Sequence, residues 1–147
     1  MPFDPGSIPP YSVIRIPVYL NEICERKRFV VLSHFNSCAI VIKPTSKIEQ
    51  FTHNKNLAAG VVMYKAGEVA VFEKATAVDP RNQFAIPHKE LIDHHTNGEL
   101  EILGILPPEF EADLRDAIDD SMDLSPRKKD RLRSLLRPPP SQTPPES

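Results

Sequence analysis

Short apolar runs separated by turn residues dominate the first two-thirds of the chain. Runs rich in β-branched and aromatic side chains cover residues 11–20, 28–34, 38–43, 61–64, 69–75 and 100–106. Turn residues between them predict two hairpins, one joining 28–34 to 38–43 and the other joining 61–64 to 69–75. Pro17 inside the first run indicates an edge position or a bulge. Because no long helical segment separates these strands, the pattern favours a small antiparallel barrel.

Helical signals come late in the chain. Residues 87–92 give at most a turn or two, whereas Pro107-Pro108 opens a helix with an apolar face made of Phe110, Leu114, Ala117 and Ile118. Ser125 followed by Pro126 predicts an N-cap and a second helix that reaches about residue 136. We therefore expect a β-barrel domain over residues 6–106, a helical pair over 107–137 packed on the barrel or extending from it, and a disordered proline-rich tail over 138–147.

Charge is unevenly distributed along the 147 residues. The total of 18 basic and 20 acidic side chains gives a formal charge of −2, but residues 1–65 have 8 basic and 4 acidic groups, residues 66–123 have 4 and 14, and residues 124–147 have 6 and 2. This split predicts a basic working face in the N-terminal half, with an acidic region that either pairs with it or forms a solvated surface.

Length and composition narrow the class of protein. The length suits one domain, and two cysteines cannot make a disulfide framework. No apolar run approaches the roughly 20 residues of a membrane span, and the first ten residues lack a signal-peptide pattern. We expect a soluble cytoplasmic protein with no membrane association.

Familiar enzyme signatures are missing from the sequence. It has no glycine-rich phosphate loop, no Gly-x-Ser-x-Gly elbow and no Cys-x-x-Cys pair. His88, His94 and His95 suggest the outline of a metal site, but adjacent residues of an extended chain point to opposite faces. A surface loop bearing histidines is the favoured interpretation, and we expect neither a metal nor a cofactor.

The strongest chemical candidate is a basic cluster near the open end of the first predicted hairpin. Pairing of the two strands through residues 35–37 would place Arg28 near the end where Thr45 and Ser46 emerge. A guanidinium beside a hydroxyl suits a phosphate group, since the fork binds non-bridging oxygens and the hydroxyl donates a further hydrogen bond. RNA supplies its own nucleophile, the 2′-OH, so strand cleavage requires no metal. The alternative is that the basic residues only keep a turn soluble, and spacing alone favours it.

The residues around this pair have candidate supporting roles. We expect the substrate to be bound by Lys27, Lys43, Lys47 and His34, with the lysines holding the RNA backbone by charge. A proton shuttle would be drawn from Glu25, His34 and His53.

The order of these residues resembles the MazF/PemK family of toxin endoribonucleases. The resemblance rests on the strand Arg28-Phe-Val-Val-Leu-Ser33, a loop, an apolar strand ending in Pro44-Thr45-Ser46, and the later apolar stretch at 69–78. It extends loosely over residues 6–121, and the family's usual proline after the arginine is Phe29 here. The resemblance implies that Arg28 and Thr45 are catalytic, with Ser46 beside them.

The family resemblance also implies a fold, an activity and partners. The fold would be a small SH3-like barrel decorated with helices and assembled as a homodimer. The activity would be metal-free cleavage of single-stranded RNA, with mRNA as the target, growth inhibition as the result and an antitoxin protein as a partner. The alternative is a non-catalytic SH3-like module that binds a protein or a nucleic acid, with the terminal helices as its docking arm.

Overall fold

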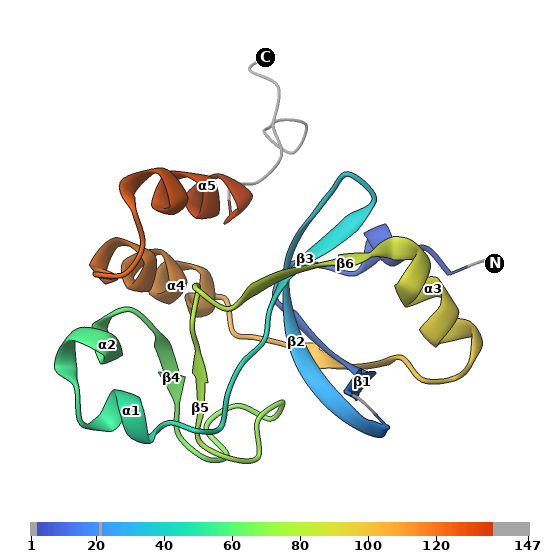
Figure 1. The fold of residues 1–147 in the computed structure, drawn as a ribbon, viewed down its shortest axis with the longest axis horizontal. Helices are drawn as coiled ribbons and strands as arrows, with labels where there is room; N and C mark the ends of the chain where they lie inside the picture. The colour runs from blue at the N-terminus through green and yellow to red at the C-terminus, as the bar shows by residue number, and fades with distance from the viewer. Residues whose placement is uncertain (1–2, 21, 137–147) are drawn as a thin grey trace.

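A computed structural model of the protein describes residues 3–20 and 22–136 (Figure 1). The tail predicted for residues 138–147 lies outside the described residues. No helix in the described part of the chain is both long enough and apolar enough to cross a bilayer.

A five-stranded antiparallel sheet forms the centre of the molecule. Its strands, in spatial order, are β6 (Gln83–Pro87), β3 (Cys38–Ile42), β2 (Ile23–Phe35), β1 (Ser12–Leu20) and β7 (Glu101–Ile105). A second, two-stranded antiparallel sheet pairs β4 (Val62–Tyr64) with β5 (Thr76–Val78). The structure confirms a small β-rich antiparallel fold in its coarse form, as a mixed α/β fold built on a five-stranded sheet. Within the described residues β6 and β7 are opposite edges that do not pair, so this sheet is not closed into a barrel.

The first predicted hairpin is confirmed. Strands β2 and β3 pair in the register Val30↔Ile42 and are joined by Asn36-Ser37. Both turn residues have positive φ, 51° and 59°, as in the type I′ turn that matches strand twist. Pro17 lies beyond Arg15, the last residue of β1 that pairs with β7, so the proline does occupy an unpaired side of β1.

The second predicted hairpin is wrong. The partner of β4 is β5, and residues 65–75 form the loop between them. Val71 and Phe72 in this loop are buried against the core without joining a ladder. Their apolar character reflects packing, which the sequence pattern alone does not separate from strand pairing.

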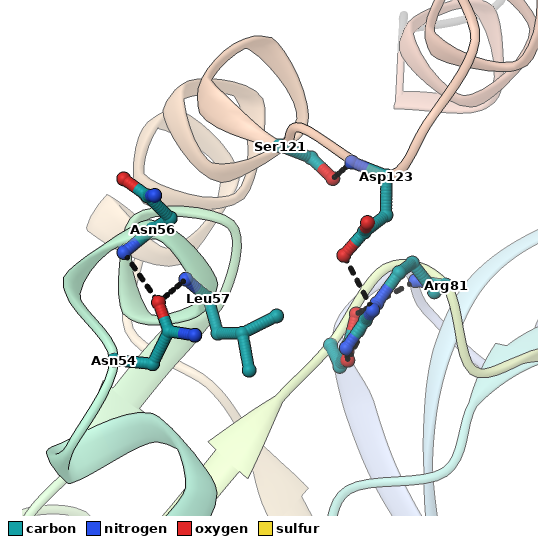
Figure 2. A network of polar contacts seen from close by, with 7 residues as sticks. Asn54, Asn56, Leu57, Arg81, Ser121 and Asp123 are labelled. Carbon is teal, nitrogen blue, oxygen red and sulfur yellow. Dashed lines mark hydrogen bonds and ion pairs between the residues drawn. The ribbon is translucent and has the colours of Figure 1, made fainter.

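The helices partly follow expectation. Helices α4 (Glu109–Asp120) and α5 (Pro126–Leu136) occur where predicted, and Ser125 Oγ accepts a hydrogen bond from the Lys128 amide as an N-cap. Helix α3 (His88–Thr96) is longer than the expected turn or two, since Leu91 and His94 bury one face of it. The sequence did not predict η1 (Pro5–Ser7), α1 (Glu49–Thr52) or α2 (Lys55–Ala59), the last capped by Asn54 (Figure 2).

Both faces of the central strands are buried. Val30 and Leu32 of β2 join one apolar cluster together with α4 and α5, while Phe29 and Val31 join a second cluster with Leu91 of α3. In Figure 1 the α4–α5 pair and α3 lie on opposite sides of the sheet. The basic segment before Phe29 lies where β2 extends past the end of β3.

Candidate functional site

A basic hollow of about 440 Å³ opens at the end of the sheet where β2, β3 and β6 meet. Its lining comes from four separate parts of the chain, which the fold brings together: Arg26, Lys27, Arg28, Lys43, Pro44, Thr45, Ser46, Lys47, Phe72, Thr76, Asn82 and Phe84. All of the predicted catalytic and substrate-binding residues except His34 are among them.

The β2–β3 register explains why Arg28 and Thr45 line the same hollow. Because Val30 pairs with Ile42, Arg28 lies level with the chain just after β3, immediately before Thr45. Thr45 is then held by a β-bridge to Ala77 of β5, with hydrogen bonds of 3.0 Å and 2.8 Å in the two directions. Arg28 thus belongs to the large sheet, and Thr45 is tied to the small one.

The Thr45 hydroxyl is arranged as a donor. Its Oγ1 accepts a hydrogen bond of 3.1 Å from the backbone amide of Lys47. A hydroxyl has one proton to give, and among the described residues no acceptor takes it. The proton is therefore available to a ligand in the hollow.

The cations of the hollow differ in how they are paired. Arg26 contacts Glu101 at 2.9 Å and the Glu99 carbonyl oxygen at 2.7 Å, while Lys27 contacts Glu25 at 2.6 Å. Within the part of the chain that is described, Arg28, Lys43 and Lys47 form no ion pair, and Arg28 Nε is buried without a hydrogen-bond partner. Unneutralised cations of this kind favour an anion such as phosphate.

The lysine side chains of this cluster affect the ionisation of Glu25. Its hydrogen bond and charge interaction with Lys27 lower the pKa of its carboxyl group, and Lys43 and Lys47 lower it further. Glu25 is exposed and does not line the hollow, so it is not in direct contact with the space between Arg28 and Thr45.

A buried carboxylate supports one wall of the hollow. Asp79, which is 5% exposed, accepts hydrogen bonds from the backbone and guanidinium of Arg81. Arg81 also reaches Asp123 in the α4–α5 connection, and Ser121 accepts the Asp123 amide (Figure 2). The next residue, Asn82, lines the hollow and accepts a 3.0 Å hydrogen bond from the Lys43 amide. The C-terminal helices thereby hold the turn that carries this wall.

The histidines lie away from the hollow. His34 contacts the Ile8 carbonyl oxygen and His88, each at 2.9 Å, so it connects η1, β2 and α3. Burial lowers the pKa of His88, and His34 lowers it further. His53 is exposed at the end of α1. His34 and His53 therefore do not join Arg28 and Thr45.

His94 and His95 lie on α3, where the sequence analysis placed them on a loop or an extended segment. His94 contacts Glu99 at 3.1 Å, and His95 stacks on Phe3. In the described ranges, no group of three or more histidine, cysteine or acidic side chains is arranged to hold a metal ion.

Two parts of the lining gave no signal in the sequence. Asn82 lies in the turn before β6, and Phe84 lies on β6 itself, a short strand with a polar start and a proline end that gave no strand signal. Phe72 reaches the hollow from the loop between β4 and β5, and Thr76 reaches it from β5. Pairing of β6 with β3 brings Asn82 and Phe84 to the hollow, and the bridge between Thr45 and Ala77 brings Thr76 of β5 there.

Comparison with known proteins adds no family assignment. No family model matches this chain, and no curated protein matches it either.

Proposed function

We propose that this protein is an endoribonuclease of the MazF/PemK toxin type, cleaving single-stranded RNA without a metal. The observation that supports the proposal is the convergence of Arg28 and Thr45 in one basic hollow, where Arg28 has no described carboxylate partner. A phosphodiester is the substrate group that uses both the guanidinium fork and a hydroxyl donor.

The proposed reaction is an internal transfer at one phosphate. The ribose 2′-oxygen bonds to the adjacent phosphorus while the bond from phosphorus to the 5′-oxygen breaks, leaving a 2′,3′-cyclic phosphate and a 5′-hydroxyl. Arg28 and the Thr45 hydroxyl hold the non-bridging oxygens as charge grows on them in the pentacoordinate transition state. Lys43 and Lys47 hold neighbouring phosphates.

Two protons must move during this step. The 2′-OH gives one up through an intervening water to Glu25, because this carboxylate is paired with Lys27 just outside the hollow and is ionised at neutral pH. The leaving 5′-oxygen takes one from Arg28. Ser46, which is exposed beside Thr45, contributes a further hydroxyl at the rim.

The biological setting follows from the same proposal. Cleavage of mRNA in the cytoplasm would inhibit growth, an antitoxin protein would neutralise the enzyme, and the active form would be a homodimer. Residues 107–136 then belong to the catalytic unit, since α4 and α5 pack on the main core.

A second candidate function is binding of nucleic acid without cleavage. It is favoured by the composition of the lining, in which the described side chains include no carboxylate and no histidine. The side chains of such a hollow can bind phosphate, but no carboxylate or imidazole among them can act as a general base.

The test is incubation of purified protein with a long single-stranded RNA in EDTA. We expect wild-type protein to cleave and both R28A and T45A to lose about 10²- to 10³-fold in rate, as for loss of one transition-state donor. R131A on the exposed face of α5 is the matched control and should cleave normally. Intact RNA at high protein excess would refute the nuclease, and RNA binding without cleavage would select the second candidate.

A further inference from the structure

An exposed aromatic side chain shares the basic hollow with the candidate catalytic pair. Phe84 lies on the edge strand β6, is 48% exposed and lines the hollow together with Lys43 and Thr45. Two residues further along β6, Ile86 is buried in the second apolar cluster. The face that carries Phe84 is thus covered by packing at one end and open at the other, where the cations lie.

The sheet register places Phe84 beside Lys43. Phe84 pairs with Val41, and the Lys43 amide bonds to the Asn82 carbonyl oxygen in the next rung. Lys43 is therefore a diagonal neighbour of Phe84, within reach of a long side chain. A flat apolar ring and an ammonium group without a described carboxylate partner lie next to each other on the open end of the sheet.

This pairing of groups matches one class of ligand. Single-stranded nucleic acids present unstacked bases with exposed π-faces, each joined to a phosphate, and proteins bind them with aromatic platforms beside cations. A duplex covers the faces of its bases with neighbouring pairs, so it would not present them to Phe84. The ring needs no 2′-OH, which means that single-stranded DNA satisfies it as well as RNA.

We propose that Phe84 is a stacking platform for a base of single-stranded nucleic acid, with the adjoining phosphate on Lys43. This proposal deepens the proposed function, on which it rests for the choice of ligand. Phe84 positions the strand across the hollow, and Arg28 and Thr45 act on a phosphate within it. The residue contributes to affinity and takes no part in proton transfer.

The test is fluorescence anisotropy with a labelled oligodeoxythymidylate, which binds without being cleaved because it has no 2′-OH. We expect F84L to weaken Kd about tenfold, as for loss of one base–aromatic stack, and F84Y to stay within about twofold of wild type. F35L is the matched control, because Phe35 is a similarly exposed phenylalanine outside the hollow.

Salt dependence separates stacking from charge. F84L should leave the slope of log Kd against log salt concentration unchanged, whereas K43Q should reduce it by about 0.7, the value for one single-strand phosphate contact. Circular dichroism melting of each variant checks that the fold is retained.

Several results would overturn the proposal. They are binding by F84L equal to wild type, equal losses in F84L and F35L, a reduced salt slope in F84L, or absence of DNA binding by the wild type. A change of oligomeric state in F84L, measured by analytical ultracentrifugation, would reassign this edge to contact between copies of the chain.

The outcomes also separate this proposal from the nuclease. Phe84-dependent DNA binding without RNA cleavage would refute only the nuclease. Cleavage of RNA with binding unaffected by F84L would refute only the stacking platform.

Discussion

Replacing Asp79 by Asn tests whether the buried carboxylate holds the wall of the hollow. The amide keeps one oxygen for the Arg81 backbone N–H, 2.9 Å away. It cannot accept the two guanidinium bonds that Oδ2 accepts from Arg81, at 3.0 Å and 2.6 Å, although the retained oxygen keeps the 3.1 Å bond from Nε. D79N is therefore close to isosteric and removes two charge-assisted bonds.

The expected loss of stability in D79N depends on how far the Arg81–Asp79 pair is exposed to solvent. A hydrogen bond to a charged group contributes about 1.5–3 kcal/mol, but the Arg81 side chain is 35% exposed and keeps Asp123 as a partner. We expect D79N to lower the free energy of unfolding by about 2–3 kcal/mol. D123N, at a carboxylate that is 51% exposed, should cost under about 1 kcal/mol.

Urea unfolding followed by circular dichroism measures both variants, and the chain has no tryptophan to serve as a fluorescent probe. Equal costs in the two variants, or a cost below about 1 kcal/mol in D79N, would show that burial of Asp79 does not govern the network. A matching loss of RNA affinity in D79N alone would connect the wall to binding.

Three other predictions concern the fold. S37G should raise the free energy of unfolding by about 0.5–1 kcal/mol in urea titrations, because Ser37 has a φ of 59° that glycine adopts without strain; an unchanged or lower value would contradict this. G104A should lower it by about 1–3 kcal/mol, since φ is 154° and a Cβ would lie 2.9 Å from Val71 Cγ1; V71A should recover part of the loss, and full additivity of the two changes would exclude the clash. Because burial lowers the folded-state pKa of His88, wild-type stability should fall as pH drops below about 6.5, the unfolded-state pKa. Thermal melts at pH 7.5 and 5.5 should show a smaller drop for H88Q than for wild type, with H53Q as the control, and equal drops would contradict the assignment.

Local signals predicted the elements that local interactions determine. The β2–β3 hairpin follows from two apolar runs around Asn36-Ser37, and α5 follows from its Ser125 cap. Barrel closure instead depends on whether distant edges meet, and no pattern within a strand encodes that. The stretch at 69–75 is apolar because its side chains are buried, and it was misread as a strand for that reason.

The candidate site likewise contains residues that local sequence patterns could place and residues that they could not. Arg28 and Thr45 could be placed together because a single hairpin register relates them. Phe84 could not, because β6 is brought to β3 by a connection of forty residues, 43–82, that contains α1, α2, β4 and β5. His34 was assigned to the correct strand, but the irregular register between Val31 and Ser33 lies just before it, and its contacts are with η1 and α3.

The bridge between Thr45 and Ala77 connects the hollow to both sheets. Arg28 belongs to the large sheet and Thr45 is bonded to the small sheet, so the distance between these two side chains depends on how the two sheets pack. A phosphate bound by both Arg28 and Thr45 would therefore link the two sheets. By thermodynamic linkage, binding of such a ligand should slow hydrogen exchange of the β4–β5 amides. A change that loosens the packing between the sheets should in turn weaken binding of the ligand by the same free energy.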